Sequence, residues 1–312
     1  MKNLLFVIVA LFALACEQEI VVDTTEVQPS VVVDAFINNL PEDQELRITL
    51  SRQFYDNRPF SGVTGVDTVY IEDVTDPSQE PYRFAQVDET RFVWERESAA
   101  DSFGIIGHTY RLVVEIGELT LESFSLLDSV PTVDSLRYNY NDGDGFVDEG
   151  YDAEFFATDL IGLGDTYWIQ GYKNGVFLDQ PEYITTSFDG SFEESTEDGI
   201  LFIPPLRSAI SPFEENEAGD GIAAPFLVGD SASVAILSIN RDAFLYLRSI
   251  AAQTDRQGGI SELFSVPVTN LNGNITASTD ERILGFFAVS SVSTGGLLLT
   301  EELARKAQEE AN

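Results

Sequence analysis

The stretch that decides the fold class runs from Thr109 to Leu121 and reads Thr-Tyr-Arg-Leu-Val-Val-Glu-Ile-Gly-Glu-Leu-Thr-Leu. Every second residue from Tyr110 to Ile116 is apolar, so an extended segment would carry one apolar face. The apolar positions resume at Leu119, directly after Gly117-Glu118, and a two-residue gap of this kind is typical of a β-hairpin. The stretch therefore predicts two half-buried antiparallel strands.

The same period of two recurs on both sides of this hairpin. In residues 30–127 it predicts further strands at 31–36, 46–50, 68–72 and 91–95. A set of about seven short strands in some 100 residues favours an immunoglobulin-like sandwich. Residues 128–134, with Pro131, are the expected join to a second β-rich domain at 128–300. Its expected strands are 135–140, 151–158, 166–172, 199–203, 233–239 and 283–291.

One segment after the join has helical rather than strand periodicity. Asn240 can cap a helix in which Phe244, Leu247 and Ile250 fall on one face, and the helix would end before Gly258-Gly259. We expect this helix to cover an open edge or end of the second domain. Residues 301–312 form the expected C-terminal tail, which is rich in Ala, Glu, Lys and Arg and is expected to be a frayed or solvated helix. The predicted fold class is therefore mainly β, with one covering helix.

The N-terminus has the layout of a secretory signal. Lys2 precedes an apolar run from Leu4 to Leu14, which is too short to span a bilayer permanently. Ala13-Leu14-Ala15-Cys16 reads as a lipobox, so residues 1–15 are the expected signal peptide, and Cys16 is the expected lipidation site. Cys16 is the one cysteine of the chain and cannot pair within it. Residues 16–29 would be a tether that holds a soluble body on the membrane.

The composition is strongly acidic, with 53 Asp and Glu against 17 Lys and Arg and a net charge of −36. Nucleic acid and anionic lipid surfaces are therefore poor partners. The acidity is compatible with a saline habitat, where salt screens self-repulsion, and equally with an ordinary acidic surface that binds divalent cations loosely.

Chemistry-bearing motifs are few. His108 is the one histidine, so a Ser-His-Asp triad would have to pass through it, and a zinc site of the usual His and Cys kinds cannot be built. The loop at 141–149 alternates Asp and Gly, and Asp142, Asp144 and Asp148 are candidate ligands of a weakly bound calcium ion. In an EF-hand register the first and twelfth positions are tyrosines, which favours a solvated acidic hairpin. We expect no catalytic residue and no cofactor beyond such calcium.

Several short motifs, in order along the chain, resemble an uncharacterised family of Bacteroidota lipoproteins, of the kind encoded beside SusC-like TonB-dependent receptors. They are Cys16-Glu17 and residues 28–33, 48–51, 130–135, 167–169, 229–230, 238–239, 272–275, 284–287 and 290–292. The resemblance implies a two-part β-rich lipoprotein at the outer membrane, with no established activity and no catalytic residue. Only Cys16 carries over as a functional position.

These observations lead to three functional hypotheses. The first is a surface-exposed, lipid-anchored outer-membrane lipoprotein that works as an accessory or ligand-capturing partner of a TonB-dependent transporter. The second is a non-catalytic subunit that assembles or stabilises an outer-membrane complex. The third is a glycan-active hydrolase that uses a pair of carboxylates, which a chain this acidic could supply in many places.

Overall fold

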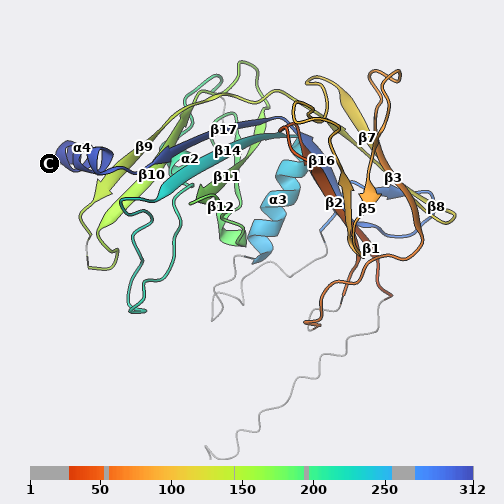
Figure 1. Cartoon of the computed structure of the whole chain (residues 1–312), viewed down its shortest axis with the longest axis horizontal. Coiled ribbons are helices and arrows are strands. Elements are labelled where there is room, and N and C mark those ends of the chain that lie inside the picture. Colours follow the sequence, from red (N-terminus) through yellow and green to blue (C-terminus); the bar gives the residue numbers. More distant parts are fainter. Residues whose placement is uncertain (1–27, 53–55, 144, 193–196, 255–270, 312) are drawn as a thin grey trace, which may run out of the picture.

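The computed structural model describes residues 28–52, 56–143, 145–192, 197–254 and 271–311. Within these residues the chain is mainly β, as the alternating pattern predicts. Figure 1 shows two β-rich parts side by side, with a helix between them.

The first part consists of two five-stranded sheets that face each other. One has the order β16-β1-β2-β6-β5, with bounds β16 (Leu284–Ser290), β1 (Val31–Asn38), β2 (Gln44–Leu50), β6 (Arg91–Trp94) and β5 (Ala85–Gln86). The other has the order β15-β8-β7-β3-β4, with bounds β15 (Thr276–Ala277), β8 (Leu119–Leu126), β7 (Thr109–Ile116), β3 (Val66–Asp73) and β4 (Tyr82–Arg83). The predicted hairpin is β7–β8, with Ile116 opposite Leu119.

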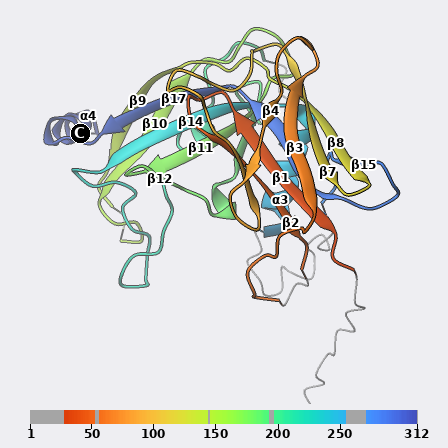
Figure 2. The same cartoon turned by 45° about the vertical axis from the view of Figure 1, so that its right-hand side comes forward.

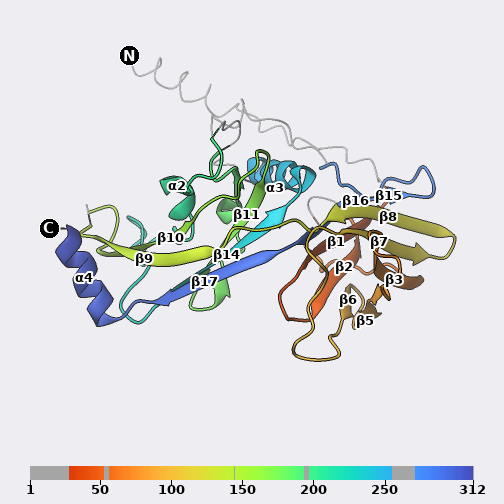
Figure 3. The ribbon, with the colours of Figure 1, turned by 90° about the horizontal axis from the view of Figure 1, so that it is seen from above.

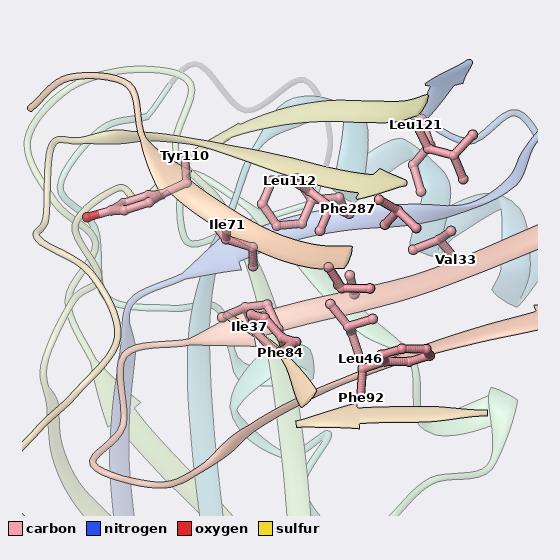
Figure 4. Close-up of a cluster of buried hydrophobic side chains, with 14 of the residues drawn as sticks. Val33, Ile37, Leu46, Ile71, Phe84, Phe92, Tyr110, Leu112, Leu121 and Phe287 are labelled. Carbon is pink, nitrogen blue, oxygen red and sulfur yellow. The ribbon is translucent and has the colours of Figure 1, made fainter. Parts of the chain in front are cut away.

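The alternating residues of these strands fill the space between the two sheets. Ile48 and Val33 come from one sheet and Leu112 and Leu121 from the other, and all four are fully buried. Phe287 of β16 lies in the same cluster, as Figure 4 shows. The first part therefore obtains part of its core from the far end of the sequence.

The second part packs a two-stranded ribbon on another sheet. The ribbon is β9 (Val133–Asn141) with β10 (Gly150–Ala157). The sheet has the order β12-β11-β14-β17, and β13 pairs with β11 (Figure 2). The bounds are β11 (Thr166–Lys173), β12 (Val176–Phe177), β13 (Thr185–Phe188), β14 (Ser231–Ile239) and β17 (Val292–Leu298), with the short helices η1 (Pro181–Tyr183) and α2 (Pro204–Arg207) beside them. Aromatic residues of both layers, among them Phe155 and Tyr167, form its core.

The expected helix is α3 (Arg241–Thr254), and its position differs from the expectation. Asn240 does cap it, because its Oδ1 accepts the backbone N–H of Ala243 at 2.8 Å. Phe244 and Leu247, however, form a cluster with Phe286 of β16 as well as with Ile239. The helix therefore fills the angle between the two parts instead of covering an edge of the second part alone.

The C-terminal tail also differs from the solvated helix that was expected. Residues Glu301–Ala311 form α4, which packs along β9 and buries Ala304 and Ala307. Figure 3 shows α4 at the far end of the second part, at the end of β17. The alanines explain the contact, because their small side chains let the helix approach the strand closely.

The boundary expected at residue 128 is one of several crossings between the parts. Residues 128–300 are divided, since β15 and β16 return to the first part and Ser291 alone separates β16 from β17. Ser291 donates a hydrogen bond to the carbonyl oxygen of Asp128, and so does Ser238, at 2.9 Å. The backbone N–H of Ser291 donates to Oγ of Ser238 at 3.0 Å. Three crossing segments are thus fastened together at one point.

One predicted strand is wrong, and one observed strand lies outside the predictions. Residues 199–203 form a single bridge, Thr158 to Leu201, rather than a strand, because Pro204 and Pro205 begin α2 directly afterwards. The strand at 292–298 was not predicted, since Gly295-Gly296 obscures its pattern. Gly295 is required there, because a Cβ would lie 2.6 Å from a side-chain carbon of Val133.

Candidate functional site

An open groove of about 490 Å³ lies on the outer face of the β9–β10 ribbon. Its polar lining comes from alternating positions of the two strands, with Asn139 directly opposite Asp152 in the register. The intervening residues, such as Tyr138 and Ala153, point into the core. The strand alternation thus places a row of amides and carboxylates on one accessible wall.

The second wall is the segment after α2, and hydrogen bonds hold it against the ribbon. Ser211 Oγ accepts the N–H of Ala153 at 2.9 Å and donates to the carbonyl oxygen of the same residue at 3.2 Å. Phe213 is an exposed aromatic residue of this wall. The Tyr183 hydroxyl accepts the backbone N–H of Phe213 at 2.9 Å and donates to the carbonyl oxygen of Phe213 at 3.1 Å. The groove therefore has one polar wall and one wall with a fixed aromatic residue.

The two carboxylates of the groove have different surroundings. Glu154 is buried and lies 2.8 Å from Arg137 and 3.7 Å from Arg207, so its charge is compensated. Asp152 takes part in none of the ion pairs formed among the described residues. Burial raises the pKa of Asp152, a hydrogen bond from Asn141 opposes that rise, and the charge of Glu154 adds to it. Asp152 is the carboxyl group of the groove that is available to a ligand.

The volume of the groove is within the roughly 300–1,000 Å³ that small-ligand sites occupy. Side-chain amides, serine hydroxyls and a carboxyl group can exchange hydrogen bonds with a polyhydroxylated ligand, and an aromatic ring can stack on its apolar face. The arrangement is suited to binding a small, hydroxyl-rich molecule.

The predicted calcium ligands lie on the loop at the end of this groove. Asp142 and Asp148 are exposed, and Asp144 falls outside the described residues. The Asp148 carboxylate accepts a hydrogen bond from the Asn216 amide at 3.4 Å, and the backbone N–H of Asp148 donates to the carbonyl oxygen of Ile222 at 2.8 Å. The loop is thus attached to the neighbouring segment, and calcium binding by these residues stays a prediction.

His108 has a structural partner. Its Nδ1 lies 2.6 Å from Oδ2 of Asp73, whose Oδ1 accepts the backbone N–H groups of Thr75 and Asp76 at 2.9 Å each. Burial raises the pKa of the Asp73 carboxyl, but these hydrogen bonds outweigh it and hold the pKa below its usual value. His108 therefore joins the turn after β3 to the start of β7.

A second group of carboxylates was missed in the sequence. Asp159, Asp165 and Asp189 each offer an oxygen, and these oxygens lie within 4.8 Å of one another. Asp159 and Asp165 are six positions apart, but Asp189 follows 24 positions later, so spacing alone does not reveal the group. The one sequence signal is local: glycines precede Asp165 and follow Asp189, where the chain turns.

Cys16 lies outside the described residues, so its lipidation also stays a prediction. In the part of the chain that the structure describes, no helix is long and apolar enough to cross a bilayer.

No curated protein and no solved structure matches this chain. A family model described as a domain of unknown function, DUF4249, matches residues 17–295. This match spans both β-rich parts, including β15, β16 and most of β17. The chain belongs to the DUF4249 family.

Proposed function

We propose that this protein is a lipid-anchored lipoprotein on the surface of a bacterial outer membrane, where it captures a ligand for a TonB-dependent transporter. The groove over β9 and β10 is the observation that carries the ligand-capturing part. The lipobox that ends at Cys16 supports the anchor, and the resemblance to lipoproteins encoded beside SusC-like receptors supports the transporter as partner.

The rigidity of the body suits this role. Strands β16 and β17 run from one part into the other with a single residue between them, and α3 fills the angle between the parts. A groove on such a body keeps a fixed orientation relative to any partner docked on the first part. Because little backbone freedom is lost on docking, the fixed arrangement favours affinity.

The different partners of the two groove carboxylates, Glu154 and Asp152, favour ligand capture over glycan hydrolysis. A hydrolase needs one carboxyl as acid and a second as base or nucleophile. Glu154 lies between Arg137 and Arg207, and its two oxygens form ion pairs with them. Asp152 is left to bind a hydroxyl group rather than to work as one of a pair.

The ligand-capturing role can be tested in cells with groove variants. Asn139→Ala combined with Asp152→Ala should reduce growth on one nutrient among a panel of single carbon sources while leaving the protein level unchanged. Glu118→Ala, at the exposed turn of the β7–β8 hairpin, is the matched control. General envelope defects with normal growth on every nutrient would instead favour the assembly role.

The transporter can be tested separately by co-purification in mild detergent. We expect the lipidated protein to be recovered with a large outer-membrane partner, and Cys16→Ala to reduce that recovery because the anchor concentrates the protein at the membrane. Recovery of an isolated monomer alone would contradict the proposal.

A further inference from the structure

Three segments of the second part meet at the cluster of Asp159, Asp165 and Asp189. Asp159 follows β10, Asp165 directly precedes β11, and Asp189 directly follows β13. Because β11 and β13 are antiparallel, with Thr166 opposite Phe188, the start of one strand lies beside the end of the other. The fold therefore brings the three carboxylates to one end of the sheet.

Hydrogen bonds fix one oxygen of each of the two buried carboxylates. Oδ1 of Asp159 accepts the Tyr167 hydroxyl at 2.7 Å. Oδ1 of Asp189 accepts the backbone N–H groups of Gly164 and Asp165 at 2.8 Å each. The backbone N–H of Asp189 also donates to the carbonyl oxygen of Asp165, at 2.9 Å. These bonds set the orientation of both carboxylates.

The second oxygen of each buried carboxylate has no hydrogen-bond partner among the described residues. These oxygens are Oδ2 of Asp159 and Oδ2 of Asp189, and the two residues are only 4% and 1% exposed. None of the ion pairs among the described residues involves this cluster. A buried carboxylate oxygen without a partner is costly, so native proteins pair it or give it a metal ion.

Solvent can reach the cluster from one side. Asp165 is half-buried, so the cluster is open to solvent on its side. A cation could enter there and keep water on its exposed face.

We propose that Asp159, Asp165 and Asp189 together bind one calcium ion. Two oxygens that share a calcium ion, each about 2.4 Å from it, are at most about 4.8 Å apart, and these carboxylate oxygens meet that limit. The donors are all hard oxygens, which suit calcium or magnesium. Calcium is the better fit, because it accepts irregular carboxylate geometry, whereas magnesium demands a near-ideal octahedron of ligands.

A glycine in the turn after Asp189 lets the chain pass close to the proposed calcium ligands. Gly190 has a φ of +66°, and a Cβ there would lie 3.2 Å from the Cβ of Asp159, so glycine lets the turn approach the carboxylate. The ion would tie this turn to the loop at 160–164, whose tip carries Ile161 at 93% exposure. Bound calcium would thus hold an exposed aliphatic loop in one position. This site is separate from the groove and does not depend on the proposed function.

The test uses the full lipoprotein in detergent, stripped with a chelator and titrated with CaCl₂ in a calorimeter. We expect one ion per chain, and Asp165→Asn should weaken binding by at least about tenfold. Asp165→Asn should still fold, because it is isosteric and the carboxylate makes no hydrogen bond within the described residues. The control, Asp134→Asn, changes an exposed aspartate of β9 that belongs to neither acidic group, and it should bind calcium as the wild type does. Asp142→Asn combined with Asp148→Asn tests the loop site separately.

Terbium provides a second readout, because Tyr167 contacts a proposed ligand and can sensitise terbium emission. Emission excited through tyrosine should be lost in Asp165→Asn and in Tyr167→Phe but kept in the control. Three results would overturn the assignment: no binding at millimolar calcium, loss of binding only in the Asp142 and Asp148 variant, or magnesium bound as tightly as calcium.

Discussion

Replacing Phe287 by alanine should destabilise the first part of the molecule strongly, although this residue follows almost the whole second part in sequence. Phe287 is 0% exposed and lies within the core between the two five-stranded sheets. Truncating a buried Phe to alanine costs about 3–5 kcal/mol, from lost transfer energy and from the cavity left behind. This is a large share of the roughly 5–15 kcal/mol that stabilises a typical domain.

The loss can be measured by urea unfolding, followed through the fluorescence of Trp94 and Trp168. Trp94 packs against the first core and Trp168 against the cluster around α3, so the two tryptophans report on different places. Phe124→Ala is the matched control, because Phe124 lies on β8 but is 53% exposed, and it should cost less than about 0.5 kcal/mol. A loss below about 1 kcal/mol for Phe287→Ala would refute the placement of β16 in this core.

Three further predictions concern the same architecture. Asn274→Ala should cost about 1–3 kcal/mol, measured by thermal unfolding, because the Asn274 amide makes two hydrogen bonds, at 2.7 and 2.8 Å, to the backbone of β16; no change would contradict a structural role. A chain that ends at residue 127 should lack the cooperative unfolding of the intact protein, because β1 loses its parallel partner β16; a cooperative transition by circular dichroism would contradict this. Asp73→Asn should destabilise the protein at neutral pH, because the hydrogen bonds from His108 and two backbone N–H groups outweigh burial and lower the pKa of Asp73. In the wild type this stabilisation is present above the ordinary pKa of 3.8 and is lost as the pH falls through the lower pKa of the folded state. The free energies of unfolding of the two proteins should therefore converge in acid.

The class of fold could be predicted from the sequence because strand alternation is a local signal. The stretch from Thr109 to Leu121 contains all of β7, the turn and the start of β8. The return of β16 to pair with β1 could not be predicted, since Leu284 lies opposite Val32 across about 250 residues and no local pattern encodes that register. The position of α3 could not be predicted for the same reason, because α3 packs against Phe286, which lies on β16.

The candidate functional residues also separate into those that a local sequence pattern indicates and those that only the fold brings together. The alternation on β9 and β10 implies an outward polar face, but the groove exists only because the segment with Ser211 and Phe213 folds over it. Asp142 and Asp148 belong to one short acidic stretch of the sequence, so a local pattern indicates them. Asp159 and Asp189 are 30 positions apart and become neighbours only through the β11–β13 pairing. Sequence reading therefore favoured the contiguous acidic motif over the one assembled by the fold.

Protease shaving of intact cells tests the central claim most directly, namely that the body of this lipoprotein stands on the outside of the outer membrane. The protein and its lipid-linked stub would be detected with and without prior opening of that membrane. We predict digestion of the body in intact cells, with the stub retained at Cys16. Protection of the body until the outer membrane is opened would place it in the periplasm and contradict its role as a surface partner of a transporter.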